Sequence, residues 1–128
     1  MEIGRIEVGL IGLGGIGMAY DLGASADRIR SHAKALTQHP NFELKFSVDP
    51  DEKARAQFTD LFHSQVFASI EVASRYSRPD LIVIATPTET HRDVIKDVIN
   101  CIRPKVILLE KPLATNIGDA EFIVELTR

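Results

Sequence analysis

The chain has 128 residues, a length typical of one domain with a single core. Hydrophobic residues make up 45% of it and charged residues 26%, a balance that excludes a disordered segment. The formal net charge is −3, so the basic excess expected of a nucleic-acid-binding protein is missing.

The composition also argues against disulfides, metal clusters and membrane spans. The sequence has one cysteine, Cys101, which excludes an internal disulfide and a thiolate-rich metal cluster, and we expect no metal site. No apolar run reaches the roughly 18 residues that a membrane span needs, and Met1–Arg5 carries no basic leader. We therefore expect a cytoplasmic protein without a membrane partner.

The sequence begins with a predicted strand, a glycine-rich turn and a long predicted helix. Ile6–Ile11 (IEVGLI) is strand-like and leads into the glycine cluster at residues 12–17. A helix is expected over about Gly15–Gln38, and it should end there because Pro40 blocks its continuation. Phe42–Val48 alternates apolar and polar residues and predicts a second strand.

Helices and strands are expected to alternate along the rest of the chain. The helical spacing of apolar residues predicts helices over Asp51–Phe62, Ile70–Tyr76, His91–Cys101 and Ile117–Thr127. Short apolar runs predict strands over Gln65–Phe67, Leu81–Ala85 and Val106–Leu109. Continuous apolar runs such as residues 81–85 suit parallel strands covered on both faces.

This alternation predicts an α/β fold of the Rossmann type. We expect one domain over residues 1–128, with a doubly wound parallel sheet of about five strands, helices on both faces and right-handed crossovers. In such folds ligands bind beyond the carboxyl ends of the strands. Each motif described below follows a predicted strand end, and this coincidence is the main structural support for a binding function.

The glycine cluster matches the phosphate-binding turn of dinucleotide-binding domains. Gly12-x-Gly14-x-x-Gly17 follows a predicted strand and opens a predicted helix, as that fingerprint requires. Its amides and the positive helix end favour anionic phosphates, although a glycine-rich turn without a ligand is the alternative. The expected cofactor-binding residues here are Gly12, Leu13, Gly14, Gly15, Ile16 and Gly17.

Asp49 follows the second predicted strand, where the fingerprint has an acid that accepts hydrogen bonds from the adenosine ribose. It lies 32 residues beyond Gly17, whereas the usual distance is about 20. The excess predicts an insertion in the first helix around Tyr20–Ile29, where Gly23 weakens helical continuity. A plain turn or helix-capping role is the alternative for Asp49.

The surroundings of Asp49 favour NAD over NADP. Pro50 follows it, so no arginine stands directly beside the ribose, and the carboxylate would repel a 2′-phosphate. Lys53 and Arg55 lie close enough in sequence to keep NADP open.

The fourth predicted strand is followed by Thr86-Pro87-Thr88-Glu89-Thr90-His91. Thr86 and Glu89 have capping-box spacing, with Pro87 at the first helical position. Capping does not account for His91, which would either face the cofactor or lie on the helix surface. The residues expected to contact the cofactor here are Thr86, Pro87, Thr88 and His91.

Glu110-Lys111-Pro112 follows the last predicted strand. The charged pair lies at the ligand edge of the sheet, where Pro112 stiffens the backbone. We expect Glu110 and Lys111 beside the cofactor, with Lys111 catalytic because its amine can assist proton transfer at a substrate hydroxyl. A solvated lysine at a strand end is the alternative.

Together these segments resemble the N-terminal domain of the glucose–fructose oxidoreductase, inositol dehydrogenase and MocA family. The resemblance covers nearly the whole chain and is carried by the ordered set of glycine turn, Asp49, Thr86-Pro87 with His91, and Glu110-Lys111-Pro112. It implies NAD or NADP as cofactor, hydride transfer at a sugar or polyol carbon, and Lys111 in the active site. The insertion resembles a subgroup with a GxxYD segment, here residues 17–21, before a Ser-His-Ala at residues 31–33.

The resemblance also implies parts that these residues do not contain. Family members continue into a C-terminal substrate domain with an open sheet and a histidine acid/base, and that domain is absent here. The isolated chain is therefore expected to bind NAD weakly and to turn over no sugar-like substrate. Without a sixth strand, the apolar edge Lys105–Leu109 predicts self-association into a homo-oligomer. The competing hypotheses are a non-catalytic dinucleotide sensor and a methyltransferase.

Overall fold

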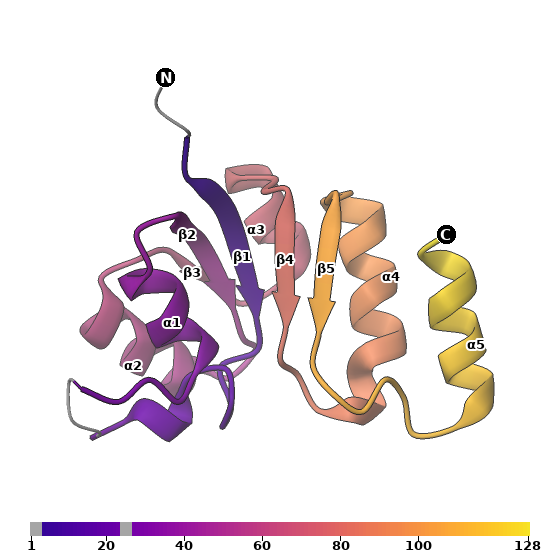
Figure 1. Cartoon of the computed structure of the whole chain (residues 1–128), viewed down its shortest axis with the longest axis horizontal. Helices are drawn as coiled ribbons and strands as arrows, with labels where there is room; N and C mark the ends of the chain where they lie inside the picture. Colours follow the sequence, from indigo (N-terminus) through magenta and orange to yellow (C-terminus); the bar gives the residue numbers. More distant parts are fainter. Residues whose placement is uncertain (1–3, 24–26) are drawn as a thin grey trace.

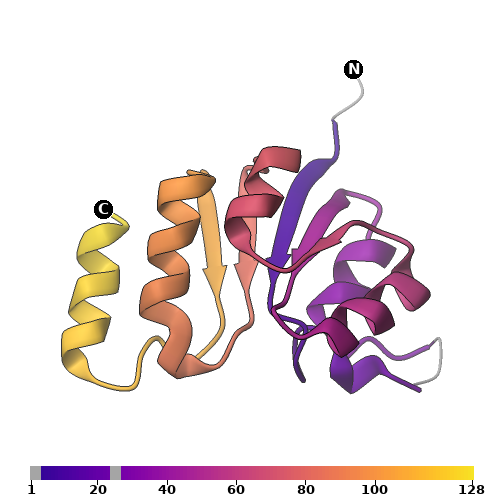
Figure 2. The same cartoon turned by 180° about the vertical axis from the view of Figure 1, so that it is seen from behind.

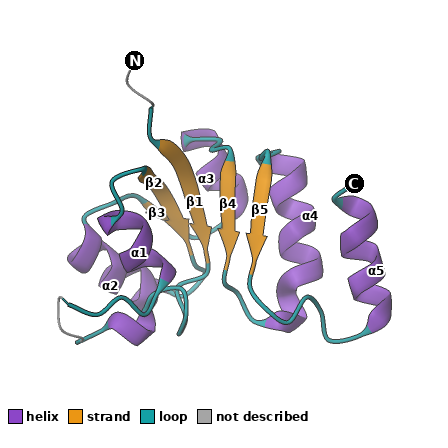
Figure 3. Ribbon diagram, in the orientation of Figure 1, coloured by secondary structure: helices purple, strands orange, loops and turns teal. Residues whose placement is uncertain are grey.

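The computed structural model describes residues 4–23 and 27–128, which form one parallel β-sheet with flanking helices (Figures 1 and 3). The strands are β1 (Ile6–Ile11), β2 (Phe42–Val48), β3 (Val66–Phe67), β4 (Leu81–Ile84) and β5 (Val106–Leu109). Their order is β3-β2-β1-β4-β5, and every neighbouring pair is parallel. The order reverses at β1, so a crevice is expected beyond the carboxyl ends of β1 and β4.

Helices cover both faces of the sheet, as Figures 1 and 2 show from opposite sides. The α-helices are α1 (His32–Gln38), α2 (Glu52–Phe62), α3 (Ile70–Tyr76), α4 (His91–Cys101) and α5 (Ile117–Leu126). Short 3-10 turns η1 (Ala19–Asp21) and η2 (Thr88–Thr90) precede α1 and α4. α1 and α2 pack on one face, α3 and α4 pack on the other, and α5 lies beside α4. The predicted doubly wound α/β fold is confirmed.

The apolar core consists of one cluster on each face of the sheet. In β4, Ile82 and Ile84 belong to the cluster beneath α3 and α4, whereas Val83 belongs to the cluster beneath α1 and α2. Successive strand residues point to opposite faces, so a continuous apolar run is needed where both faces are covered. This arrangement explains why the central strands lack polar alternation.

The predicted helix over Gly15–Gln38 is wrong, because α-helix is formed only by its last part, α1. The long spacing between Gly17 and Asp49 predicted an insertion, and the structure confirms it. Residues 24–26 of the insertion lie outside the described residues. The chain leaves the glycine turn through η1 and returns at α1. There His32 N donates to the Ile16 carbonyl at 2.9 Å and Ala33 N to the Gly17 carbonyl at 2.8 Å. α1 therefore continues directly from the glycine turn in space but not in sequence.

A nearly buried carboxylate, Asp21, holds the two ends of the insertion together. Its oxygens accept the Arg30 amide at 3.1 and 3.0 Å, and Ser31 also donates to it. Burial alone would raise the pKa of Asp21. The hydrogen bonds from Ser31 and Arg30, together with the nearby Lys34 ammonium, outweigh burial and hold that pKa below its ordinary value. Lys34 also donates to the Arg28 carbonyl.

Candidate functional site

The glycine turn lies at the carboxyl end of β1, and at two of its glycines a Cβ would clash with main-chain atoms. Gly12 has a φ of +103°, and a Cβ there would lie 2.6 Å from the Ala85 carbonyl oxygen. A Cβ at Gly17 would lie 2.1 Å from the Gly12 carbonyl oxygen. Gly14 differs, because a Cβ there would meet nothing within 4 Å. Gly12 and Gly17 thus shape the turn, while Gly14 borders open space.

Main-chain amides of this turn are available to a ligand. Within the described part of the chain, the amides of Gly14, Gly15 and Ile16 have no hydrogen-bond acceptor. The side chain of Leu13 is buried in the core, and its amide donates to Asp49 Oδ2 at 2.9 Å. Consecutive unpaired amides in such a turn form an anion-binding concavity that suits phosphate.

Asp49 is held at the end of β2 by main-chain amides. Oδ2 accepts from Leu13, and Oδ1 accepts from the Asp51 amide, also at 2.9 Å. Each oxygen keeps a lone pair for a further donor such as a ribose hydroxyl. The Arg55 guanidinium donates to the carbonyls of Asp49 and Pro50 at 2.9 and 2.8 Å. A cation therefore lies near this end, engaged by the main chain.

Two pockets adjoin along the carboxyl edge of the sheet. One, of about 480 Å³, is lined by Asp49 and the start of α3, and the other, of about 420 Å³, by Glu110 and Lys111. Both are lined by Gly14, Ala85, Thr86 and Pro87. Together they form an elongated cleft, which we call the edge cleft. It has a carboxylate at one end, an ammonium at the other and the glycine turn between them.

The segment after β4 forms one side of the edge cleft, but the predicted capping box is wrong. α4 begins at His91, after η2, and its N-cap residue Thr90 makes no side-chain capping bond. Thr90 donates instead to the Pro87 carbonyl at 2.6 Å, and its hydroxyl lies 2.8 Å from that of Thr86. Thr86 and Pro87 line both pockets, whereas Thr88 lines neither.

His91 lies neither in the edge cleft nor on the helix surface, the two positions expected for it. It is 1% exposed, with Nε2 3.1 Å from the Thr86 carbonyl oxygen and Nδ1 3.1 Å from that of Leu113. A neutral imidazole has one N–H and donates to one of these carbonyls at a time. His91 therefore connects the segment after β4 to the segment after β5, and these two segments border the edge cleft.

Glu110 and Lys111 follow β5 directly, where the Glu110 amide donates to the Ile84 carbonyl at 3.0 Å. Glu110 Oε1 lies 2.7 Å from His32 Nε2, so the start of α1 contacts this segment. The Lys111–Pro112 peptide bond is cis. Lys111 is exposed and lines the edge cleft opposite the glycine turn.

Comparison with known proteins agrees with this geometry. Residues 6–128 match the family model described as the Gfo/Idh/MocA oxidoreductase family, NAD-binding Rossmann fold. The chain belongs to this family. The match spans β1 to the end of the chain, so the resemblance drawn from the sequence motifs is confirmed. The Gfo/Idh/MocA family binds NAD through its Rossmann fold, and the glycine turn of this chain lies where that fold needs it.

Two proteins similar to this Gfo/Idh/MocA domain are named as inositol dehydrogenases. An inositol 2-dehydrogenase from Rubrobacter xylanophilus is 30% identical over 122 residues, which cover 94% of this chain and 31% of the relative. A crystal structure of a myo-inositol dehydrogenase from Corynebacterium glutamicum matches with a TM-score of 0.72 and 26% identity, over 94% of this chain and 32% of that one.

A third similar protein was solved with its cofactor. GenD2 from gentamicin A biosynthesis, in complex with NAD, gives a TM-score of 0.72 at 27% identity, over 98% of this chain and 32% of that one. The Gfo/Idh/MocA domain described here spans about a third of the length of these relatives.

The edge cleft fits a dinucleotide. Gly14 lines both pockets and has free space where its Cβ would be, so a diphosphate can approach the backbone closely. Asp49 offers an acceptor at one end, and Lys111 offers a donor at the other. Each of these groups belongs to a different strand end, as expected for a ligand that crosses the switch point of the sheet.

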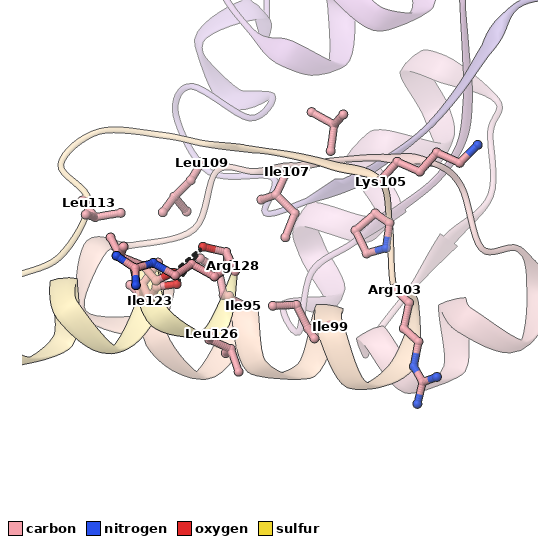
Figure 4. Close-up of a pocket in the computed structure, with 14 residues that line it drawn as sticks. Ile95, Ile99, Arg103, Lys105, Ile107, Leu109, Leu113, Ile123, Leu126 and Arg128 are labelled. Carbon is pink, nitrogen blue, oxygen red and sulfur yellow. Dashed lines mark hydrogen bonds between the residues drawn. The ribbon is translucent and has the colours of Figure 1, made fainter.

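A larger pocket, of about 600 Å³, lies elsewhere, between β5, α4 and α5 (Figure 4). Its apolar lining includes Ile95, Ile99, Ile107, Leu109, Ile123 and Leu126. The glycine turn, Asp49 and Lys111 do not contribute to it, so it lacks the groups expected to bind the cofactor. In the described ranges, no helix combines the length and the apolar character needed to cross a bilayer.

The sequence motifs do not single out Tyr20, which lines the edge cleft, or His32, which contacts the lining residue Glu110. In the sequence, His32 is only part of the Ser-His-Ala that follows the insertion, and Tyr20 is only part of the GxxYD segment. The structure brings both to the carboxyl edge, with His32 against Glu110 and Tyr20 against the glycine turn. Their positions depend on how the insertion folds back, which local sequence patterns do not reveal.

Proposed function

We propose that this chain is the cofactor-binding domain of an NAD-dependent dehydrogenase acting on a CH–OH group of a sugar, a polyol or a related hydroxy compound. The edge cleft carries the proposal, because the glycine turn, the Asp49 carboxylate and the Lys111 amine all line it. The inositol 2-dehydrogenase name of one relative supports the substrate class.

Each end of the edge cleft has a distinct proposed role in holding the cofactor. The amides of Gly14, Gly15 and Ile16 would bind the diphosphate, and Asp49 would accept the adenosine ribose hydroxyls. The carboxylate would repel a 2′-phosphate, which favours NAD over NADP. Arg55 already donates to two main-chain carbonyls, so it is poorly placed to offset that repulsion.

Lys111 is the proposed catalytic residue of this chain. The chemistry that NAD supplies when bound is the transfer of hydride at its nicotinamide ring. Alcohol oxidation also requires a group that handles the hydroxyl proton, and the Lys111 amine lies at the end of the edge cleft where it can assist. We propose that residues outside this chain supply the substrate pocket and the main acid/base, since the chain spans 31% of the inositol 2-dehydrogenase.

Calorimetric titration of the chain with NAD, NADP and S-adenosylmethionine tests the cofactor assignment. We expect NAD to bind, NADP to bind more weakly and S-adenosylmethionine not to bind. The isolated chain is expected to show no dehydrogenase turnover. Binding of S-adenosylmethionine in preference to NAD would refute the proposal and support a methyltransferase.

Replacing Lys111 with alanine in the full-length protein tests the catalytic role. We expect kcat to fall about 10²- to 10⁴-fold, the range for lost general acid–base assistance, and NAD affinity to fall much less. Lys105→Ala is a matched control, because Lys105 is an exposed lysine at the opposite end of β5. Unchanged turnover in Lys111→Ala would contradict the catalytic role and favour a dinucleotide sensor.

A further inference from the structure

We propose that Tyr20, in the insertion, forms an aromatic wall of the edge cleft and stacks on the nicotinamide ring of bound NAD. This inference rests on the proposed function and adds a ligand contact that the glycine turn, Asp49 and Lys111 do not provide. Tyr20 lines the same pocket as Glu110 and Lys111, the end at which the nicotinamide is expected.

The Tyr20 ring lies directly over the glycine turn. The Tyr20 amide donates to the Gly15 carbonyl at 2.9 Å. A Cβ at Gly15 would lie 2.6 Å from Tyr20 Cζ and 2.9 Å from its Oη. The ring therefore occupies the space that any side chain at position 15 would need. Glycine at this position makes room for the tyrosine, whereas the free space beside the main chain lies at Gly14.

The backbone around Tyr20 is fixed by buried neighbours. Met18, two residues before it, is 1% exposed within the core beneath α1. Asp21, the next residue, is bound by the Arg30 amide and by Ser31. A main chain held in this way fixes the Tyr20 backbone before a ligand arrives, so only the side chain has to be ordered by the contact.

Much of the Tyr20 ring surface remains uncovered and faces a pocket with suitable chemistry. Tyr20 is 61% exposed, and Ile16 beside it is also exposed. With Pro87 they give the pocket an apolar side, while Glu110 and Lys111 give it polar groups. A flat ligand with a polar substituent, such as a nicotinamide, matches both sides.

The charge of the oxidised nicotinamide adds a preference. The face of a tyrosine ring carries negative charge density and attracts a cation that lies over it. We therefore expect Tyr20 to favour oxidised NAD over NADH. Phenylalanine keeps such a face and should preserve the contact, whereas alanine removes it.

Calorimetry with whole and partial ligands tests this contact. ADP-ribose contains the diphosphate and both riboses but lacks the nicotinamide ring. In the 128-residue chain, Tyr20→Ala should weaken NAD about tenfold, within the range of aromatic and cation–π contacts, and leave ADP-ribose unchanged. Tyr20→Phe should bind NAD nearly as the original chain does. Unaltered ADP-ribose binding also shows that the variant is folded.

Fluorescence gives a second readout, because the chain has two tyrosines and no tryptophan. Tyr76 lies on α3, outside the edge cleft, so Tyr76→Phe leaves Tyr20 as the only tyrosine of this chain. In that variant, NAD should quench the tyrosine emission, after correction for absorption, and ADP-ribose should not. Tyr76→Phe should bind NAD as the original chain does.

The outcomes separate this inference from the proposed function. If Tyr20→Ala binds NAD as tightly as the original chain, or loses NAD and ADP-ribose affinity equally, the stacking contact is refuted while dinucleotide binding stands. If the original chain binds neither NAD nor ADP-ribose, the proposed function is refuted and the contact with it.

Discussion

Alanine substitutions at Gly17 and Gly14 separate the two roles of the glycine turn. At Gly17 the added Cβ would lie 2.1 Å from the Gly12 carbonyl oxygen and 2.9 Å from its carbon, both main-chain atoms. These atoms cannot withdraw easily, because the Gly12 amide donates to Val48 and the Gly17 carbonyl accepts from Ala33. At Gly14 the same Cβ would meet nothing within 4 Å and would project into the edge cleft.

The expected magnitudes follow from these distances. Overpacking costs about 1–3 kcal/mol, and we expect about 3 kcal/mol for Gly17→Ala because main chain must move. For a domain of this size that loss lowers Tm by about 10 °C. Gly14→Ala should stay within about 1 kcal/mol of the original stability. Its NAD affinity should fall by about tenfold or more, because the methyl group occupies the approach of the diphosphate.

Thermal unfolding followed by circular dichroism measures the first effect, and calorimetric titration with NAD measures the second. Gly17→Ala is expected to lose both stability and binding, and Gly14→Ala to lose binding alone. The reasoning is refuted if both variants lower Tm by the same amount, or if Gly14→Ala binds NAD like the original chain.

Three further predictions concern other parts of the molecule. The folded pKa of Asp21 is lowered, so its charge stabilises the fold above the ordinary value of 3.8, and this contribution is lost as the pH falls through the folded pKa. Urea unfolding between about pH 2 and 5 should therefore show a shallower loss of stability in Asp21→Asn than in the original chain, and parallel curves would contradict this. Asp49→Ala should weaken NAD about 10- to 100-fold, as expected for lost hydrogen bonds to a charged group, and should reduce the discrimination against NADP in parallel titrations. An unchanged NAD-to-NADP ratio would exclude a role of the carboxylate in that choice. The chain should self-associate through β5, where Val106 and Leu108 are 58% and 50% exposed, and Val106→Lys should shift it towards monomer in sedimentation. A clean monomer of the original chain at high concentration would count against edge pairing.

Most elements of the fold could be predicted because the spacing of apolar residues within each segment indicates whether it forms a helix or a strand. Ile70–Tyr76 and His91–Cys101 form helices with the predicted bounds, and Val106–Leu109 forms a strand as predicted. The prediction of a helix over Gly15–Gln38 was wrong because of a contact between residues that are distant in sequence. A run with helical character does not reveal that the Asp21 carboxylate binds the Arg30 amide and so bends the chain into an insertion.

Some residues of the site could likewise be placed from local sequence patterns, and others could not. The glycine turn and Asp49 follow strand ends, and parallel strands bring such ends to one edge of the sheet, so the sequence suffices to place them together. His91 could not be placed, because its partners Thr86 and Leu113 meet only after β4 and β5 pair. Tyr20 could not be placed either, since its position depends on the folded insertion.

The return of the insertion to its point of departure has a consequence for variation among related sequences. The first bonds of α1, from His32 and Ala33 back to the glycine turn, are the ones an uninterrupted helix would make. We therefore expect that the segment between Asp21 and Arg30 can differ in length and composition without a change in the strand register or the helix axis. The rim of the binding site is free to diversify while the framework that carries it stays constant.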